Sequence, residues 1–204
     1  MADKSEDILT YWFGEHAPSQ GDGDVARERQ RLWFSADDTV DADIEARFGQ
    51  LLVSAARGEL ERWSETPRGR LALIILLDQF SRNIYRGTPD AYANDRMALA
   101  HSLEGQTRGQ DRELRPVERI FFYMPMMHTE ALPVQDEAVQ RFQALAEAVE
   151  PGERDAFQPS VDAAQQHREI ILRFDRFPHR NRILGRDSTP AELAFLETPG
   201  SSFP

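Results

Sequence analysis

The chain has 204 residues, enough to bury a sizeable core, and no cysteine, which excludes disulfides and thiol chemistry. Its 35 acidic and 24 basic residues give a net charge of −11, which argues against a nucleic-acid backbone or an anionic membrane as partner. The first residues lack the basic start and apolar core of a signal peptide, so we expect a soluble, cytoplasmic protein.

The most informative stretch is TPRGRLALIILLDQFSRNIYRGT, residues 66–88. Thr66 and Pro67 are a helix start signal, because a hydroxyl cap precedes a proline at the first helical position. Gly87 tolerates the left-handed conformation that ends many helices. Residues 71–77 are apolar on every side, which predicts a helix that is covered all round. This run is too short to cross a bilayer.

Polar residues follow this apolar run at helical spacing. Asp78 falls on the same stripe as Leu71, and a buried carboxylate needs a partner. Arg82, four residues further on, is the predicted partner, and Gln79 and Asn83 form a second pair at the same spacing. Two interpretations stay open: a network that ties the helix to its neighbours, or the polar floor of a pocket.

Apolar residues at helical spacing recur along the rest of the chain. They predict further helices over residues 5–13, 25–34, 37–58, part of 88–105, 116–125, 133–149, 158–174 and from 189 onward. Pro125 should kink or end its helix, so that His128 and Glu130 emerge directly after an apolar segment. Residues 176–186 read as an arginine-rich loop.

The last helix begins with a capping box formed by Thr189 and Glu192. No stretch alternates apolar and polar residues over the length of a strand, so the predicted fold is all-α. Eight or nine helices joined by short loops predict one domain over residues 5–198, built from antiparallel helical hairpins.

Three blocks of sequence together carry a resemblance to a known family: LALIILLDQFSRNIYRGT (71–88), FFYMPMMHTE (121–130) and HREIILRFDRFPHRNRILGRDSTPAELAFL (167–196). Over residues 8–196 the chain resembles the bacterial family called domain of unknown function 924. Ser81, where many members have proline, and Asp175, where glycine is commoner, depart from the family pattern. The resemblance implies a tetratricopeptide-like array of helices and no established activity.

The first candidate site is an anion site on the first and third blocks, where guanidinium and amide donors would suit a carboxylate or phosphate. Its predicted ligand-binding residues are Gln79, Arg82, Asn83, Arg86, His179, Arg180, Asn181 and Arg186. The competing interpretation is that these arginines neutralise helix C-termini and pair with Asp78, Asp175 and Glu130.

Acid–base catalysis and metal binding are the other candidates. Asp78, His128 and Glu130 could act as acid or base, since a partly buried carboxylate can be poised near neutrality. His128, Glu130 and His167 are ligand types that suit zinc or iron, but the H-x-E spacing is not specific and we predict no metal. No G-x-G-x-x-G, P-loop or G-x-S-x-G motif occurs, so no cofactor is expected.

The sequence therefore predicts a binding or interaction protein whose Arg/Asn/His-lined groove takes an acidic small molecule or peptide. The alternative is a small-molecule hydrolase or lyase, with or without a metal, that uses His128, Glu130 and Asp78. In a third interpretation the polar blocks only hold the fold together. Enzyme and binding protein are both open at this point.

Overall fold

The computed structural model describes residues 4–201, and no β-strand occurs in that range, which confirms the predicted all-α class. A π-helix, η3 (Ile75–Phe80), joins α4 to α5. With these three segments counted as one helix, the described residues form nine α-helices, within the predicted number. The bounds are α1 Lys4–Phe13, α2 Asp22–Phe34, α3 Asp38–Ala56, α4 Pro67–Ile74, α5 Ser81–Ile84, α6 Asp95–Thr107, α7 Pro116–Met127, α8 Leu132–Ala148, α9 Arg154–Phe174 and α10 Pro190–Leu196.

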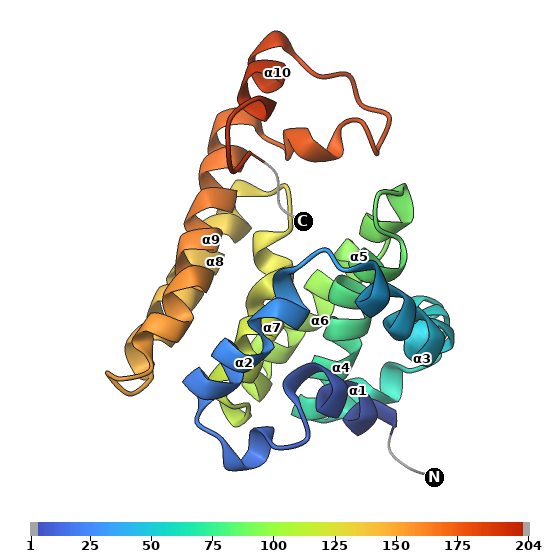
Figure 1. Ribbon diagram of the computed structural model, residues 1–204, viewed down its shortest axis with the longest axis vertical. Helices are drawn as coiled ribbons and strands as arrows, with labels where there is room; N and C mark the ends of the chain where they lie inside the picture. Colours follow the sequence, from blue (N-terminus) through green and yellow to red (C-terminus); the bar gives the residue numbers. More distant parts are fainter. Residues whose placement is uncertain (1–3, 202–204) are drawn as a thin grey trace.

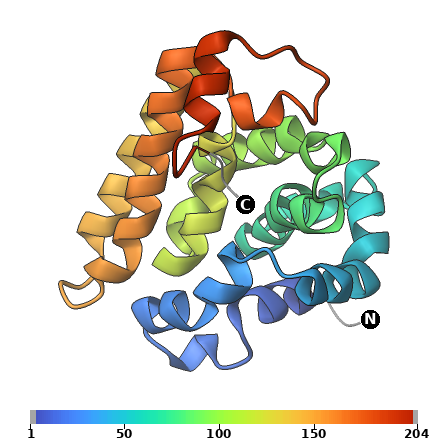
Figure 2. The same cartoon turned by 45° about the horizontal axis from the view of Figure 1, so that its top comes forward.

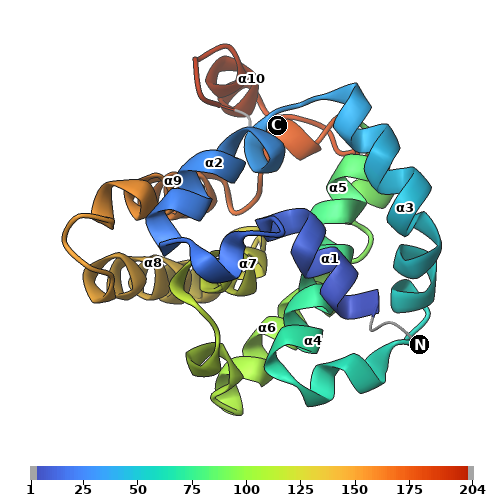
Figure 3. The same ribbon diagram turned by 60° about the horizontal axis from the view of Figure 1, so that its bottom comes forward.

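The helices are arranged around the continuous helix formed by α4, η3 and α5. It packs against α1, α3, α6 and α7 (Figure 1). Helices α8 and α9 form a long antiparallel hairpin on one side, which contacts the rest through α7 and α2 (Figure 3). Helix α10 lies near one end of this hairpin, next to the short 3-10 turn η6 (Pro178–Arg180) (Figure 2). The tetratricopeptide-like order of the hairpins stays a prediction.

The central helix is buried as its sequence predicts. Every residue from Leu71 to Leu77 is at most 2% exposed. At its start the hydroxyl of Thr66 accepts a hydrogen bond from the Gly69 N–H at 3.1 Å, and Gly87 follows its end with a φ of 76°. No helix within residues 4–201 combines the length and the apolar character needed to span a membrane.

The π-helix η3 is the feature of the central helix that periodicity does not predict. A π turn holds more residues than an α turn, so it rotates the residues that follow it relative to an ideal α-helix. Asp78 and Gln79 lie within this segment, and both are buried. Short π segments inside α-helices occur often at functional sites. The π turn therefore determines the directions in which the polar side chains at the end of the apolar run point.

Helix α2 starts earlier than predicted. The sequence pattern places its start at Val25, whereas the helix begins at Asp22. The backbone N–H of Gly23, one of the donors that a helix start leaves without an internal partner, donates to Glu153 Oε1 at 3.0 Å. Glu153 lies 130 residues away in the sequence, so a local pattern carries no sign of this contact.

Pro125 does not end its helix, and α9 starts earlier than predicted. Helix α7 continues past Pro125 to Met127, because a proline in the last turn removes one hydrogen bond and disturbs little that follows it. Helix α9 begins at Arg154 instead of at Gln158, so Pro159 lies inside its N-terminal part.

Candidate functional site

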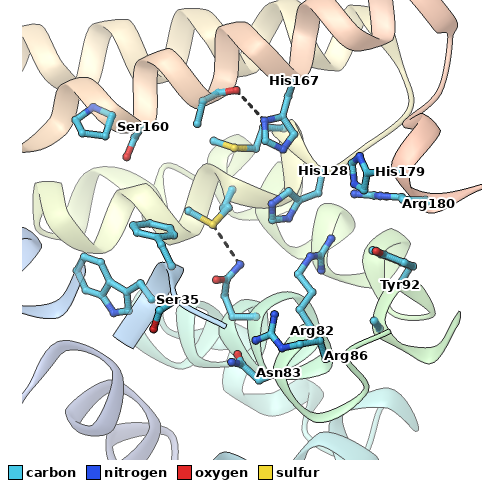
Figure 4. Close-up of a pocket in the computed structure, with 18 of the residues that line it drawn as sticks. Ser35, Arg82, Asn83, Arg86, Tyr92, His128, Ser160, His167, His179 and Arg180 are labelled. Carbon is cyan, nitrogen blue, oxygen red and sulfur yellow. Dashed lines mark hydrogen bonds between the residues drawn. The ribbon is translucent and has the colours of Figure 1, made fainter. Parts of the chain in front are cut away.

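A cavity of about 420 Å³ lies where the end of α2, the η3–α5 segment, the end of α7, α9 and η6 meet. Figure 4 shows His128, His167 and His179 across the cavity from Arg86 and Asn83. Eight of the residues singled out from the sequence line it: Gln79, Arg82, Asn83, Arg86, His128, His167, His179 and Arg180. Three blocks that are far apart in the sequence therefore converge on one space.

The predicted pair of Asp78 and Arg82 is confirmed. Asp78 is 1% exposed, and Arg82 Nη1 lies 3.0 Å from its Oδ1. Gln79 Nε2 donates to the other carboxylate oxygen at 2.5 Å. Burial raises the pKa of Asp78, but Arg82, His128 and Gln79 together outweigh burial, so the pKa of this carboxyl is lowered. Asp78 is therefore ionised and held from several sides.

His128 is attached to the same carboxylate. Its Nδ1 lies 2.7 Å from Asp78 Oδ1, and because an ionised carboxylate only accepts, Nδ1 carries the proton. The basic Nε2 is on the opposite edge of the ring and makes no hydrogen bond to any residue from 4 to 201. Burial and Arg82 lower the pKa of His128 despite the nearby Asp78. Its imidazole is therefore neutral near pH 7.

Two more imidazoles share the cavity with His128. The ring centroid of His167 is 5.9 Å from that of His128, and His167 Nδ1 lies 2.7 Å from the backbone oxygen of Ala163, one turn earlier in α9. Burial lowers the pKa of His167 well below its ordinary value, and burial together with Arg180 lowers the pKa of His179 to about 4. The cavity is thus lined by neutral imidazoles.

Arg180 is buried, at 6% exposed, and has only part of its hydrogen-bonding capacity in use. Its Nη1 donates to Asp95 Oδ2 at 3.2 Å. The rings of Tyr92 and Phe177 have their centroids 4.6 and 4.5 Å from its guanidinium carbon. Its Nε has no hydrogen-bond partner among the described residues. A guanidinium fixed in this way, beside a cavity, is suited to receive an anion.

Asp95 was missed by the sequence analysis as a site residue. It links the two arginines, since its Oδ2 also accepts from Arg82 Nη2 at 3.1 Å. The one signal in the sequence was the spacing of Asp95 from the aromatic Tyr92, three residues before it, near the start of a predicted helix. This spacing is equally typical of ordinary packing. We call Asp78, Arg82, Asp95, His128 and Arg180 the cavity cluster.

An apolar wall faces part of the cavity and was also missed, because its residues read as ordinary core. Its members are Trp33 and Phe34 at the end of α2, Met124 and Met127 on α7, and Pro159 and Ala163 on α9. Phe34 is 45% exposed, unlike the buried Trp33 beside it. The site therefore has a polar side and an apolar side.

The predicted pair of Gln79 and Asn83 is not formed. Gln79 donates to Asp78, whereas Asn83 Nδ2 donates to Asp41 Oδ1 at 2.7 Å. Arg86 binds the same carboxylate of Asp41 with Nε at 2.7 Å and Nη2 at 3.0 Å. Asn83 and Arg86 therefore line the cavity, and the Nδ2 of Asn83 and the Nε–Nη2 edge of Arg86 are already engaged with Asp41.

Nearly all of the chain matches the model of one protein family. A family model described as "Bacterial protein of unknown function (DUF924)" matches residues 8–200. The chain belongs to this family. It is also similar to the solved structure of a protein of unknown function from Agrobacterium tumefaciens, with 36% sequence identity, a TM-score of 0.79, and coverage of 96% of this chain and 98% of the other. No curated protein matches the chain.

Two of the predicted ligand-binding residues in this DUF924 chain do not lie in the cavity. Arg186 binds Glu130 through Nη1 at 2.7 Å and Nη2 at 2.9 Å, and its Nε donates to Asn181 Oδ1 at 3.0 Å. Glu130 also accepts the backbone N–H of Phe177 at 2.8 Å. Asn181 and Arg186 therefore do not line the cavity with Arg180, contrary to the prediction from the sequence; they bond to each other, and Arg186 bonds to Glu130. We call Glu130, Asn181 and Arg186 the closed cluster.

The candidate metal set is not assembled. His128 and His167 are close to each other, but the carboxylate of Glu130 is occupied by Arg186 and by the N–H of Phe177. Among the residues that the structure describes, no three His, Asp or Glu side chains are grouped so as to hold a metal ion. The same contacts remove Glu130 from the acid–base candidates, which leaves Asp78 and His128.

Proposed function

We propose that the cavity binds a small molecule that carries one carboxylate on an apolar body. The observation that carries this proposal is the buried guanidinium of Arg180, whose Nε has no hydrogen-bond partner within residues 4–201 while Asp95 holds Nη1. A buried donor without a partner costs about 1–3 kcal/mol, and a ligand oxygen would remove that cost. The Nε–Nη2 edge of a guanidinium matches the two oxygens of a carboxylate.

The charges on the polar wall favour a ligand with a single negative charge. Arg82 and Arg180 are offset by Asp78 and Asp95, and the imidazoles around them are neutral. The wall thus offers directed donors without a large excess of positive charge. Each negative charge on the ligand would add to this balanced set, so a carboxylate costs less to bury there than a doubly charged phosphate.

The other wall suits an apolar body. Trp33 and Phe34 offer aromatic surface, and Met124 and Met127 offer flexible thioether side chains that adapt to varied shapes. The volume of about 420 Å³ lies in the lower part of the range of roughly 300–1,000 Å³ that is usual for small-molecule sites. This supports a small molecule over a peptide.

Calorimetric titration with phenylpropionate and its neutral isostere phenylpropanamide tests the proposal. We expect the wild type to bind the carboxylate about tenfold or more tightly than the amide, the equivalent of one hydrogen bond to a charged group. Arg180→Gln should lose this preference. Arg186→Gln is the matched control, because the guanidinium of Arg186 is closed on Glu130, and it should bind as the wild type does. Equal binding of acid and amide by the wild type would contradict the proposal.

A further inference from the structure

The ring of His128 is fixed at one edge and open at the other. Asp78 accepts from Nδ1 at 2.7 Å, and Arg82 at 3.0 Å and Gln79 at 2.5 Å hold the carboxylate in place. Nε2 lies on the opposite edge of a ring that lines the cavity (Figure 4), and no described residue forms a hydrogen bond with it. The tautomer and the direction of the lone pair are thereby set, as a general base requires.

A general base needs a proton to remove, and residues 4–201 do not offer one at this point. There is no cysteine. Ser35 and Ser160 line the cavity, but Figure 4 shows both at the end away from His128, and no Ser or Thr hydroxyl of residues 4–201 forms a hydrogen bond with His128. The proton therefore comes from a molecule that shares the cavity with the ligand, and water is one that is always available.

We infer that the cavity is the active site of a hydrolase in which His128 is the general base and Asp78 positions it. In this inference His128 activates water to attack the ester or amide carbonyl carbon of a substrate whose separate carboxylate is bound by Arg180. The inference rests on the proposed function, because a carboxylate on Arg180 would place the acyl group at the end of the cavity that Arg180 and His128 share (Figure 4). The substrate class is the half-ester or half-amide of a dicarboxylic acid with an apolar leaving group.

The reaction needs no oxidant, reductant or co-reactant besides water. The water oxygen bonds to the acyl carbon while one water proton moves to His128 Nε2 and the carbonyl electrons move to oxygen. When this intermediate collapses, the carbonyl re-forms, the bond to the leaving alkoxide or amine breaks with its electron pair, and the proton on Nε2 passes to that group. The products are an alcohol or amine and a carboxylic acid, which releases the second water proton to the solvent and becomes the dicarboxylate. Arg82, which lines the cavity, would contribute its positive charge to the negative oxygen while its Nη1 and Nη2 stay on Asp78 and Asp95.

Mono-p-nitrophenyl esters of succinic, glutaric and adipic acid test this inference, since the release of nitrophenolate is followed by absorbance. The wild type should raise the rate of at least one of them above its uncatalysed rate by a larger factor than it does for the uncharged p-nitrophenyl butyrate. His128→Gln should slow that reaction by about 10²–10⁴-fold, the usual contribution of a general base. His16→Gln is the matched control, because His16 is an exposed imidazole outside the cavity, and its rate should equal that of the wild type.

The pH profile tests the role of Asp78. Burial and Arg82 lower the pKa of His128, so the rate should rise with pH through a value below the ordinary pKa of histidine and then level off. Asp78→Asn should move this profile along the pH axis as well as lower the rate, which a purely structural role would not do. The charged and titratable groups that surround His128 are Asp78, Arg82, Asp95, His167, His179 and Arg180.

The failure of this inference differs from the failure of the proposed function. If the wild type prefers phenylpropionate through Arg180 but hydrolyses no ester faster than His128→Gln does, the catalytic inference is overturned and the binding function stands. If Arg180→Gln binds phenylpropionate as the wild type does, the proposed function falls and the inference that rests on it falls too. An acyl group found on His128 by mass spectrometry would also overturn its role as a general base. If Asp78→Asn does not fold, the rate test uses His128→Gln alone, because this variant leaves the Asp78–Arg82 pair in place.

Discussion

Two arginine clusters in this protein look alike in sequence and differ in whether their donors are used. In the closed cluster, Nε, Nη1 and Nη2 of Arg186 all have acceptors, on Asn181, Glu130 and the backbone of Phe177. In the cavity cluster, Arg180 gives Nη1 to Asp95 and has an Nε without a partner among the described residues. A high density of arginine therefore does not by itself point to a site, and the proposed site rests on the unused donor of Arg180 beside the cavity.

Removal of one carboxylate from each cluster should give the largest difference in the free energy of unfolding. Asp78→Ala leaves Arg82 and His128 buried without their shared acceptor, so we expect a loss of about 3–5 kcal/mol in the free energy of unfolding. Glu130→Ala removes a more exposed partner and should cost about 1–3 kcal/mol. Urea denaturation of both variants measures the difference. Equal losses in the free energy of unfolding would contradict the expectation that Asp78 contributes more to stability than Glu130.

Mild acid should destabilise the cavity side before the closed cluster. The unfolded chain binds protons on histidine near pH 6.5, whereas the lowered pKa values of His128, His167 and His179 keep these imidazoles neutral in the folded protein. The unfolded state therefore binds more protons, and stability falls as the pH decreases below about 6.5. Each histidine contributes up to about 1.4 kcal/mol per pH unit.

Denaturation at several pH values between about 5 and 7 measures this slope. His179→Asn should reduce the slope by up to about 1.4 kcal/mol per pH unit. Glu130→Gln is the control: burial raises the pKa of Glu130, but Arg186 and the Phe177 N–H outweigh burial and lower it, so Glu130 does not titrate in this range. A slope that is the same in the wild type and in His179→Asn would show that His179 is not held neutral by the fold.

The smallest expected effect lies in the closed cluster. Asn181→Ala removes the acceptor for Arg186 Nε and the donor to Ser188 Oγ at 3.0 Å. Because Arg186 keeps its contacts with Glu130, we expect a loss of about 1–2 kcal/mol, the net worth of two ordinary hydrogen bonds. Phenylpropionate affinity should not change. A weaker affinity in calorimetry would connect the closed cluster to the cavity.

Much of the fold followed from local sequence patterns. Apolar spacing gave the helices, and the caps at Thr66 and Thr189 are formed as predicted. The π-helix and the early start of α2 were missed for a physical reason. Periodicity assumes 3.6 residues per turn, and the contact of Glu153 with Gly23 depends on packing between distant segments.

The site was predictable only where its contacts are local. Asp78 and Arg82 are four residues apart on one helix, so spacing alone identified their pair. Asp95 is separated from Arg180 by 85 residues, and no spacing rule joins them. Arg180 and Asn181 are neighbours, yet only Arg180 lines the cavity, because the side chain of Asn181, which follows η6, bonds to Ser188 and Arg186 instead.

The most direct test of the account is a crystal structure of the protein grown with phenylpropionate. The account predicts that the carboxylate lies on the Nε–Nη2 edge of Arg180, with its oxygens at about 2.7–2.9 Å, and that the phenyl ring contacts Trp33 and Phe34 in the cavity. A structure in which Arg180 Nε is covered by another part of the chain, or in which phenylpropionate binds outside the cavity, would contradict it.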